Sequence, residues 1–275
     1  MLKAPEALSW QREDTMVGII GGSGLYQIEG IGIRKKIEVK TPYGSPSDSY
    51  IIGELSDKTI VFLPRHGKKH AVPPHKINYR ANIWGFKELG VERILSVGAV
   101  GGLTPRTKPG SIVIPDQIID MTRARHATFF EGKSRVVHID FTEPFCKGLR
   151  KALVAAASRT RTTVMKKGTY IVVNGPRLET AAEIRVFARQ GADVVGMTAM
   201  PEAVLAREAE ICFACIAVVT NAAAGITEGR LSAKEVIETM KASTDKIRAL
   251  LRAFFSLGVG TSACSCGTAL QDARM

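Results

Sequence analysis

Short apolar runs that break into small or polar residues recur along the chain, and this pattern predicts buried strands. Runs of this kind occupy residues 17–20, 59–63, 94–97, 111–115, 117–121 and 216–220. Two half-exposed strands are expected at 33–39 and 50–55, on either side of a Pro- and Gly-containing turn. In open α/β sheets ligands gather at the carboxyl ends of the strands, so the polar breaks are where a site is expected.

Helices are predicted between these strands by apolar positions at near-helical spacing. The expected helices cover residues 76–89, 144–158, 179–190, 200–209 and 232–256. Gly90 is placed to end the first helix, and Ser232 with Glu235 forms a capping box at the start of the last. Residues 1–15 show no periodicity, and 123–133 is expected to be an exposed loop. No internal repeat or linker divides the chain.

Composition narrows the class of protein. The 275 residues are 45% hydrophobic and 23% charged, as is ordinary for a globular protein. The net charge of +12 attracts anions, but the Lys and Arg residues are scattered and not interleaved with aromatics, which disfavours a nucleic-acid module. No apolar run approaches the roughly 18 to 20 residues that span a bilayer, and no signal-peptide core is present, so a cytoplasmic protein is expected.

Five cysteines are present, and their spacing fits no zinc pattern because Cys264 and Cys266 have one intervening residue and no matching second pair. Reduced, buried thiols are the default in the cytosol, with hyperthermophiles as the exception. A bridge between Cys264 and Cys266 would close a very small, strained ring.

Three strand ends carry residues suited to an anion. The first is the turn Gly21–Gly24, where Ser23 could donate a hydrogen bond, and the second is the glycine-rich run Gly98–Gly102. The third ends in Arg65 and His66, a donor fork beside a donor or proton source, although a solvated loop is the commoner meaning of such a pair.

These strand ends fit a free phosphate better than a nucleotide. The first turn lacks the third glycine of a dinucleotide fingerprint, because Gln27 stands there, and it lacks the Lys of a P-loop. A nicotinamide or ATP site is therefore disfavoured. The loop with His70 and His75 has no carboxylate or Cys at ligand spacing, so a metal site is rejected there.

Glu179 and Asn221 are the informative pair for an organic ligand. A carboxylate accepts hydrogen bonds, whereas an amide donates and accepts, so together they match the N1 donor and the O6 and N7 acceptors of a 6-oxopurine. Adenine matches this pair less well. The alternative, of equal weight from these residues alone, is that Glu179 caps a helix and Asn221 sits in a turn. His138 is a candidate for the pocket edge or a structural histidine.

Five segments together resemble the trimer-type purine nucleoside phosphorylases, and most closely their methylthioadenosine phosphorylase branch. The segments, in family order, are Gly18–Leu25, Pro64–Gly67, Pro74–Asn82, Asn174–Thr180, and Gly196–Thr198 with Pro201–Glu202. The resemblance implies one α/β domain over 16–256, built on a mixed, partly closed β-sheet flanked by helices. An N-terminal extension (1–15) and a Cys-containing tail (257–275) would flank it.

The resemblance also implies roles, an assembly and the reactants. Phosphate-binding positions are matched by Ser23, Arg65, His66, Gly98, Ala99 and Thr198. Substrate positions are matched by Met197 and Leu178, with His138 supplied to the 5' group by a neighbouring subunit, and the base-reading and catalytic positions by Asn221 and Glu179. The implied assembly is a homotrimer or a dimer of trimers, with inorganic phosphate as co-substrate and no cofactor. Cys146 and Cys212 match positions that are bridged in thermophilic relatives.

At the base the chain departs from the methylthioadenosine branch. That branch is expected to have Ser in place of Glu179, and Asp residues in place of Asn221 and Ala223. The residues present resemble those of relatives that cleave inosine, guanosine or methylthioinosine. A methylthioadenosine phosphorylase is the alternative, since one water can invert a hydrogen-bond preference. A nucleoside-binding protein without turnover and a basic nucleic-acid binder are the alternatives from other classes.

Overall fold

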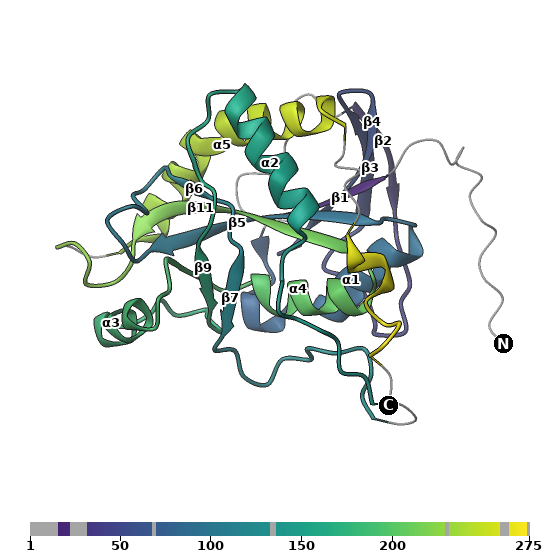
Figure 1. The fold of residues 1–275 in the computed structure, drawn as a ribbon, viewed down its shortest axis with the longest axis horizontal. Coiled ribbons are helices and arrows are strands. Elements are labelled where there is room, and N and C mark those ends of the chain that lie inside the picture. The colour runs from purple at the N-terminus through teal and green to yellow at the C-terminus, as the bar shows by residue number, and fades with distance from the viewer. Residues whose placement is uncertain are drawn as a thin grey trace.

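A computed structural model describes residues 16–22, 32–67, 70–132, 136–228, 231–258 and 264–273. The expected N-terminal extension and Ser23 lie outside these residues. The described chain forms a mixed sheet of eleven strands (Figure 1). The strands are β1 (Val17–Gly21), β2 (Gly32–Ile37), β3 (Tyr50–Leu55), β4 (Lys58–Pro64), β5 (Arg93–Gly102), β6 (Ile112–Val113), β7 (Gln117–Asp120), β8 (Val164–Met165), β9 (Thr169–Val172), β10 (Val194–Gly196) and β11 (Cys212–Ala222).

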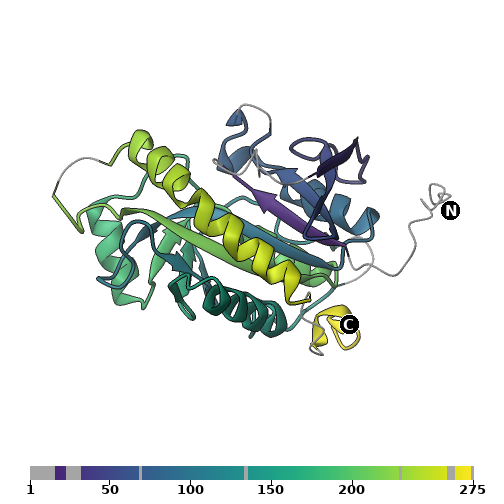
Figure 2. The same ribbon diagram turned by 90° about the horizontal axis from the view of Figure 1, so that it is seen from above.

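Helices cover both faces of this sheet (Figures 1 and 2). They are α1 (Tyr79–Glu88), α2 (Lys147–Arg159), α3 (Ala181–Arg189), α4 (Ala199–Glu208) and α5 (Ala233–Ser256), with short 3-10 turns η2 (Pro74–Lys76) and η3 (Ser265–Thr268). Apolar side chains of α2 and α5 pack with one face of the sheet, and those of α1 and α4 pack with the other. The predicted α/β class with a mixed sheet is confirmed.

The helix starts follow local capping. Asn78 accepts a hydrogen bond from the Ala81 N–H and so begins α1 later than the apolar pattern indicated. Thr180 caps α3, and its capping-box partner is Glu183. Ser232 accepts from the Glu235 N–H at the start of α5, as expected.

Two expectations were wrong, and a third is only partly met. The strand at 50–55 is mostly buried, because β3 lies between β2 and β4 and its Tyr50 packs edge-on against Phe86 of α1. The expected loop at 123–133 is a loop over its described residues, 123–132, and half of these are exposed, but Phe129 is buried and Arg125 is partly buried. The glycine run at 98–102 is not a loop after a strand: it is the second half of β5.

The sheet forks along one edge of β5. There β5 pairs in parallel with β1 as far as Val97, and it pairs antiparallel with β10 only from Gly101 onward. Its other edge pairs with β11 throughout. Gly98, Ala99 and Val100 therefore lie where two neighbouring strands diverge, and a pocket can open between them.

Candidate active site

A cavity of about 200 Å³ lies at this fork. Its walls come from the carboxyl ends of β1, β4, β5, β10 and β11 and from the loop before α3. The lining residues are Gly22, Arg65, His66, His70, Pro74, Gly98, Ala99, Val100, Gly101, Leu178, Glu179, Val195, Gly196, Met197, Thr198, Thr220, Asn221 and Val236. The structure thus brings together every candidate site residue that it describes, except His138.

Arg65 is a buried cation, not part of a solvated loop. Its Nε and Nη2 donate to the two carboxylate oxygens of Glu202 at 2.5 and 3.2 Å, Nη2 also donates to Ser96 Oγ, and Nη1 donates to the Val97 carbonyl. Burial alone would lower the pKa of Arg65, but the charge and hydrogen bonds of Glu202 raise it. Four bonds use four of its five N–H groups, which leaves one on Nη1, the atom that faces Gly22.

His66 is neutral at physiological pH. Burial, together with the neighbouring Arg65 charge, lowers the pKa of His66 to about 4. Its Nδ1 lies 2.8 Å from the carbonyl oxygen of Val72, and because a carbonyl only accepts, Nδ1 carries the proton. The remaining nitrogen, Nε2, is then an acceptor, and it lies beside Gly22 as the Arg65 Nη1 does.

Thr198 lines the same cavity as Arg65 and His66. It is the N-cap residue of α4, but its hydroxyl makes no capping bond. A Cβ on Gly98 would lie 3.7 Å from that hydroxyl, so the hydroxyl is close to the β5 backbone at Gly98. Hydroxyl, backbone and guanidinium donors therefore face one space that suits a tetrahedral anion.

Met197 lies next along the wall, and its backbone is held from outside the cavity. Arg125 donates to the carbonyls of Met197 and Met200 at 2.7 and 2.5 Å and to that of Asn174 at 2.8 Å. Gly175 has φ of +62°, and a Cβ there would lie 2.3 Å from the Met197 sulfur, so this turn needs glycine. The sequence did not indicate this role of Arg125, because no residue near it in the predicted loop shows that its side chain bonds to carbonyls of distant segments.

A β-bulge in β11 determines which residues of that strand line the cavity. The register of β11 against β5 shifts between Val219 and Asn221, so Thr220 is an extra residue and both Thr220 and Asn221 face the cavity. The Thr220 hydroxyl lies 3.0 Å from Asn221 Oδ1, the nearer of its two acceptors, and 3.3 Å from the Val100 carbonyl oxygen. Asn221 Nδ2 donates to the Ala222 carbonyl at 2.9 Å. One Nδ2 hydrogen is left, and the amide presents a donor to the cavity. Thr220 was not among the predicted site residues.

Glu179 lies on the same cavity from the loop before α3. It does not cap that helix, because Thr180 and Glu183 do, and Asn221 is in a strand and not a turn. The pKa of Glu179 is raised, chiefly because the carboxyl is partly buried. Its neighbour Leu178 is 43% exposed at the cavity mouth.

Two further histidines differ in their positions. His70 lines the cavity with its ring 4.2 Å from that of His66, a contact that the sequence did not indicate. His138 is exposed and lies away from the cavity, where its backbone N–H donates to the Ala273 carbonyl in the C-terminal segment.

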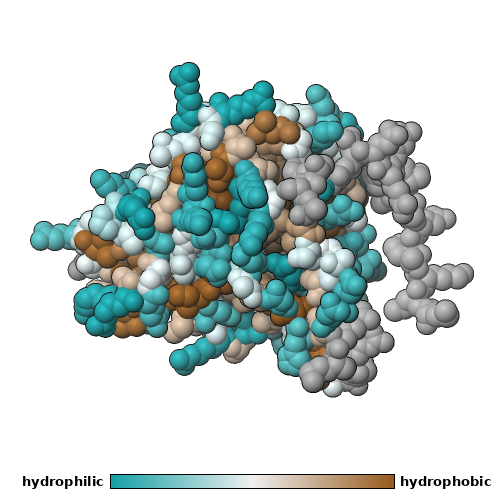
Figure 3. Space-filling model, viewed as in Figure 1, coloured by the Kyte–Doolittle hydropathy of each residue, from teal (hydrophilic) through white to brown (hydrophobic). Residues whose placement is uncertain are grey.

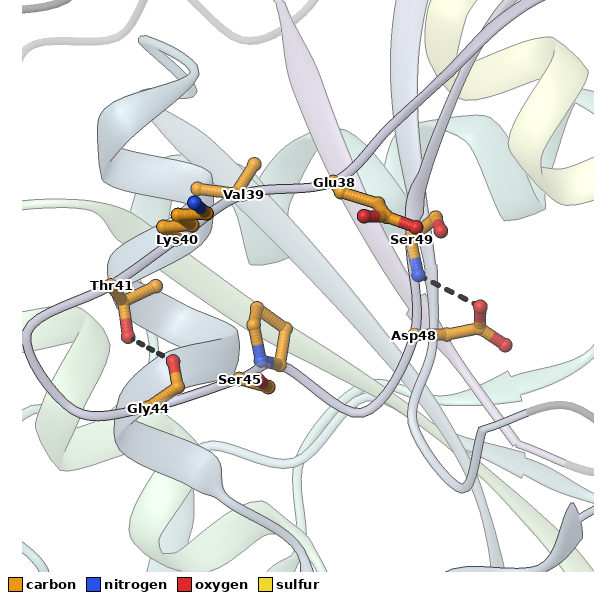
Figure 4. Close-up of a pocket in the computed structure, with 9 residues that line it drawn as sticks. Glu38, Val39, Lys40, Thr41, Gly44, Ser45, Asp48 and Ser49 are labelled. Atoms are coloured by element: carbon orange, nitrogen blue, oxygen red, sulfur yellow. Dashed lines mark hydrogen bonds between the residues drawn. The ribbon is translucent and has the colours of Figure 1, made fainter.

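A second hollow, of about 660 Å³, lies beside the chain between β2 and β3 (Figure 4). Its polar side chains serve the local loop: Thr41 Oγ1 donates to the Gly44 carbonyl, and Asp48 accepts from the Ser49 N–H. The predicted turn at 41–46 is confirmed here, with Gly44 at φ of +92°. This hollow lacks the convergent donors of the cavity at the fork.

The face shown in Figure 3 is mostly hydrophilic, with apolar side chains in small separate patches. Among the described residues no helix is long and apolar enough to cross a bilayer.

Comparison with known proteins gives a consistent result. A model of the phosphorylase superfamily matches residues 16–256. The chain is 52% identical to a probable S-methyl-5'-thioinosine phosphorylase of Thermodesulfovibrio yellowstonii, over 95% of this chain and 98% of that protein. It is 48% identical to the 6-oxopurine nucleoside phosphorylase of Pyrococcus furiosus, over 94% and 98%. The methylthioadenosine phosphorylase of Schistosoma mansoni, solved with adenine, superposes with a TM-score of 0.90 at 33% identity, over 95% and 99%.

Proposed function

Because the chain belongs to the phosphorylase superfamily, we propose that it is a purine nucleoside phosphorylase that favours 6-oxopurine nucleosides. It would cleave the N-glycosidic bond with inorganic phosphate and release the free base and ribose 1-phosphate or its 5-methylthio form. Relatives named for 6-oxopurine nucleosides and for methylthioinosine support this choice.

The observation that carries the base preference is the fixed orientation of the Asn221 amide. With Oδ1 accepting from Thr220 and one Nδ2 hydrogen donated to Ala222, the side on which the amide carries its remaining N–H is fixed, and this N–H is available to a ligand. A purine N7 or O6 accepts that N–H, and the Glu179 carboxylate accepts the N1–H that a 6-oxopurine has and adenine lacks.

The other end of the cavity supplies the phosphate. The free Nη1 hydrogen of Arg65, the Thr198 hydroxyl and the β5 backbone at Gly98 and Ala99 would hold its oxygens, with Ser23 added from the family resemblance. His66 Nε2 is an acceptor and so would accept a hydrogen bond from a phosphate hydroxyl.

Reaction then proceeds by positioning and charge stabilisation. A phosphate oxygen bonds to C1' of the sugar as the bond from C1' to the purine nitrogen breaks, and the electron pair of that bond goes to the base. The bound anion stabilises the cationic sugar, while Asn221 and Glu179 stabilise the departing purine. Met197 would lie against the ribose. No cofactor is needed.

The main alternative is a methylthioadenosine phosphorylase. The solved relative of that name and its close structural match support it. As part of the proposal, the chain acts as a cytoplasmic homotrimer or dimer of trimers, in which His138 of one subunit reaches the 5' group bound by the next.

Initial rates with phosphate on inosine, guanosine, adenosine, methylthioadenosine and methylthioinosine test the proposal. Faster turnover of the 6-oxo compounds is expected. Preference for methylthioadenosine would contradict the base assignment but not phosphorolysis, and no turnover of any of the five would contradict both.

A double variant tests the two base-reading residues directly. Asn221→Asp with Glu179→Ser should shift preference toward 6-aminopurine nucleosides by roughly 10-fold or more, because each change exchanges a donor and an acceptor at the base. The KM for phosphate serves as the control and should stay within about 2-fold. An unchanged ratio of inosine to adenosine turnover would show that other groups read the base.

A further inference from the structure

Four of the five cysteines gather at one point outside the active site. The sulfur atoms of Cys146, Cys212, Cys264 and Cys266 all lie within 4.8 Å of one another, and the structure has them as free thiols. Neither the Cys146–Cys212 bridge nor the Cys264–Cys266 bridge considered from the sequence is formed. Cys215, the fifth, is buried elsewhere, beside Ser96.

Two of these sulfurs stand on rigid elements. Cys146 is the N-cap residue of α2, and its N–H donates to the Phe213 carbonyl at 2.8 Å. Cys212 begins β11, and its N–H donates to the Glu92 carbonyl at 2.9 Å. The other two flank the first residue of η3, in the C-terminal segment. The group therefore joins the domain to the end of the chain, which Figure 2 shows near the ends of α2 and α5.

Sulfur spacing fits a tetrahedral metal better than a disulfide. A zinc thiolate bond of about 2.3 Å puts the four sulfurs of a tetrahedral site roughly 3.8 Å apart, whereas bonded sulfurs lie about 2.05 Å apart. The sulfurs of Cys212 and Cys264 are 3.3 Å apart, and the others lie within the 4.8 Å limit.

The surroundings suit a negatively charged thiolate cluster. Cys146 lies at the positive end of α2 and near the Leu149 N–H, and the Arg207 guanidinium is close enough to act on Cys266. Among the residues that the structure describes, no His or carboxylate belongs to the group. Four soft sulfur donors select zinc over magnesium or calcium.

We propose that Cys146, Cys212, Cys264 and Cys266 form a zinc-binding site that fastens the C-terminal segment to the phosphorylase domain. Binding of Zn²⁺ releases the four thiol protons and needs no oxidant or reductant. The site does not depend on the proposed function. It explains why a C-x-C pair without a local partner pair is present: the other two ligands come from distant parts of the chain.

The fastened segment contacts the domain at two further points. The Leu270 N–H donates to Glu210 Oε1 at 3.2 Å, and the Ala273 carbonyl accepts from the His138 N–H at 2.8 Å. A metal at the four cysteines would therefore order the residues that support the His138 backbone.

The test measures zinc in the full-length chain, purified with a thiol reductant and without chelator. Elemental analysis should find about one zinc per chain. Co²⁺ in place of zinc should give the visible and charge-transfer bands of a tetrahedral thiolate site. Cys212→Ser with Cys264→Ser should lose the metal, while the matched control Cys215→Ser keeps it, with circular dichroism to show that each variant is folded.

Three results would overturn the proposal. The first is wild-type protein with all its thiols titratable and no stoichiometric zinc. The second is equal zinc in the double variant and the wild type. The third is peptide mapping, without reductant, that finds Cys146 joined to Cys212 or Cys264 joined to Cys266, because bridged sulfurs cannot ligate the metal.

Discussion

Asn221 can discriminate between purine bases only if its side-chain amide is held in one orientation. Rotated by half a turn, the amide would set Oδ1 against the Ala222 carbonyl, so that two acceptors would face each other and the bond from Nδ2 to Ala222 would be lost. The bulge in β11 makes this possible, because adjacent residues of a regular strand point to opposite faces. Specificity at the base thus depends on a hydroxyl that need not touch the base.

Thr220→Val tests this dependence with little change of shape. Loss of one hydrogen bond, worth about 1 kcal/mol, should narrow the inosine-to-adenosine ratio of kcat/KM by roughly 5- to 10-fold. Thr244→Val is the matched control, since the Thr244 hydroxyl bonds only to the Met240 carbonyl within α5. If the ratio stays as in the wild type, Thr220 does not orient the amide.

His66 should make stability depend on pH in a defined window. The pKa of His66 is about 4 in the folded chain and about 6.5 in the unfolded chain. Between these two pH values, His66 is therefore protonated in the unfolded chain and neutral in the folded chain. Above pH 6.5, His66 is neutral in both states and its titration does not affect the free energy of unfolding. As the pH falls from 6.5 toward 4, protonation of the unfolded chain lowers the free energy of unfolding by up to about 3 kcal/mol.

Urea unfolding of His66→Asn and wild type at pH 7 and pH 5 measures that loss. The variant should lose less stability between the two values than the wild type does, at equal protein concentration. Glu179 and Glu208, with raised pKa values, act in the opposite direction in both proteins, so the difference between the two proteins is the readout. The exposed His75→Asn is the control, and a His66→Asn slope equal to wild type would contradict the argument.

At the scale of elements, the cavity exists because β5 changes partners along one edge. Its first half pairs with β1 and its end with β10, and the two glycines of that end are needed because other chain segments lie close to them. A Cβ on Gly102, for example, would lie 1.9 Å from the Thr107 carbonyl oxygen. The apolar pattern predicted β1 and β5 but carried no information about which strands would be their neighbours.

Arg125 connects three of these elements from outside the cavity. It bonds carbonyls at the ends of β9 and β10 and at the start of α4, and its guanidinium lies 5.1 Å from the Tyr79 ring centre. Arg125→Met should lower the free energy of unfolding by about 2–4 kcal/mol, because several carbonyls lose a charged donor.

The same variant should raise the KM for the nucleoside more than the KM for phosphate, since the bonded carbonyls include that of Met197. Arg123→Met is the matched control: Arg123 is exposed, and its bonds to Asn174 are made by its backbone. Denaturant melts and steady-state kinetics measure both effects. If Arg125→Met and Arg123→Met change the free energy of unfolding and the KM for the nucleoside equally, the Arg125 hydrogen bonds contribute to neither.

At the scale of the whole molecule, the sequence was informative about elements and chemistry and poor about long-range contacts. Strand ends, the predicted helices and the convergence of Arg65, Glu179 and Asn221 followed from patterns that extend over a few residues. The partners of Arg65 and the gathering of the four cysteines could not follow, because Glu202 and Cys212 are distant in sequence and no local spacing marks them. The local sequence of Arg65 does not show whether the side chain is exposed and unpaired or buried and paired with Glu202, because burial depends on contacts with distant parts of the chain.

His138 lies outside the cavity of its own chain, so its role depends on how the subunits assemble. If subunits of a closed trimer share sites, a chain with Arg65→Met still offers its His138 to a neighbour, and a chain with His138→Ala still offers an intact phosphate site. Each variant alone should cleave methylthioinosine poorly. Coexpressed in equal amounts, they should form mixed trimers in which about half of the His138→Ala chains have a competent site, by random assembly.

Restored turnover in the coexpressed sample, but not after mixing the two assembled proteins briefly, would place His138 in the neighbour's site. Inosine is the internal control, since it lacks the methylthio group and its turnover should depend less on His138. If coexpression gives only the average of the two single variants, His138 acts in its own subunit or not at all, and the exposed position seen in one chain would then be its functional position.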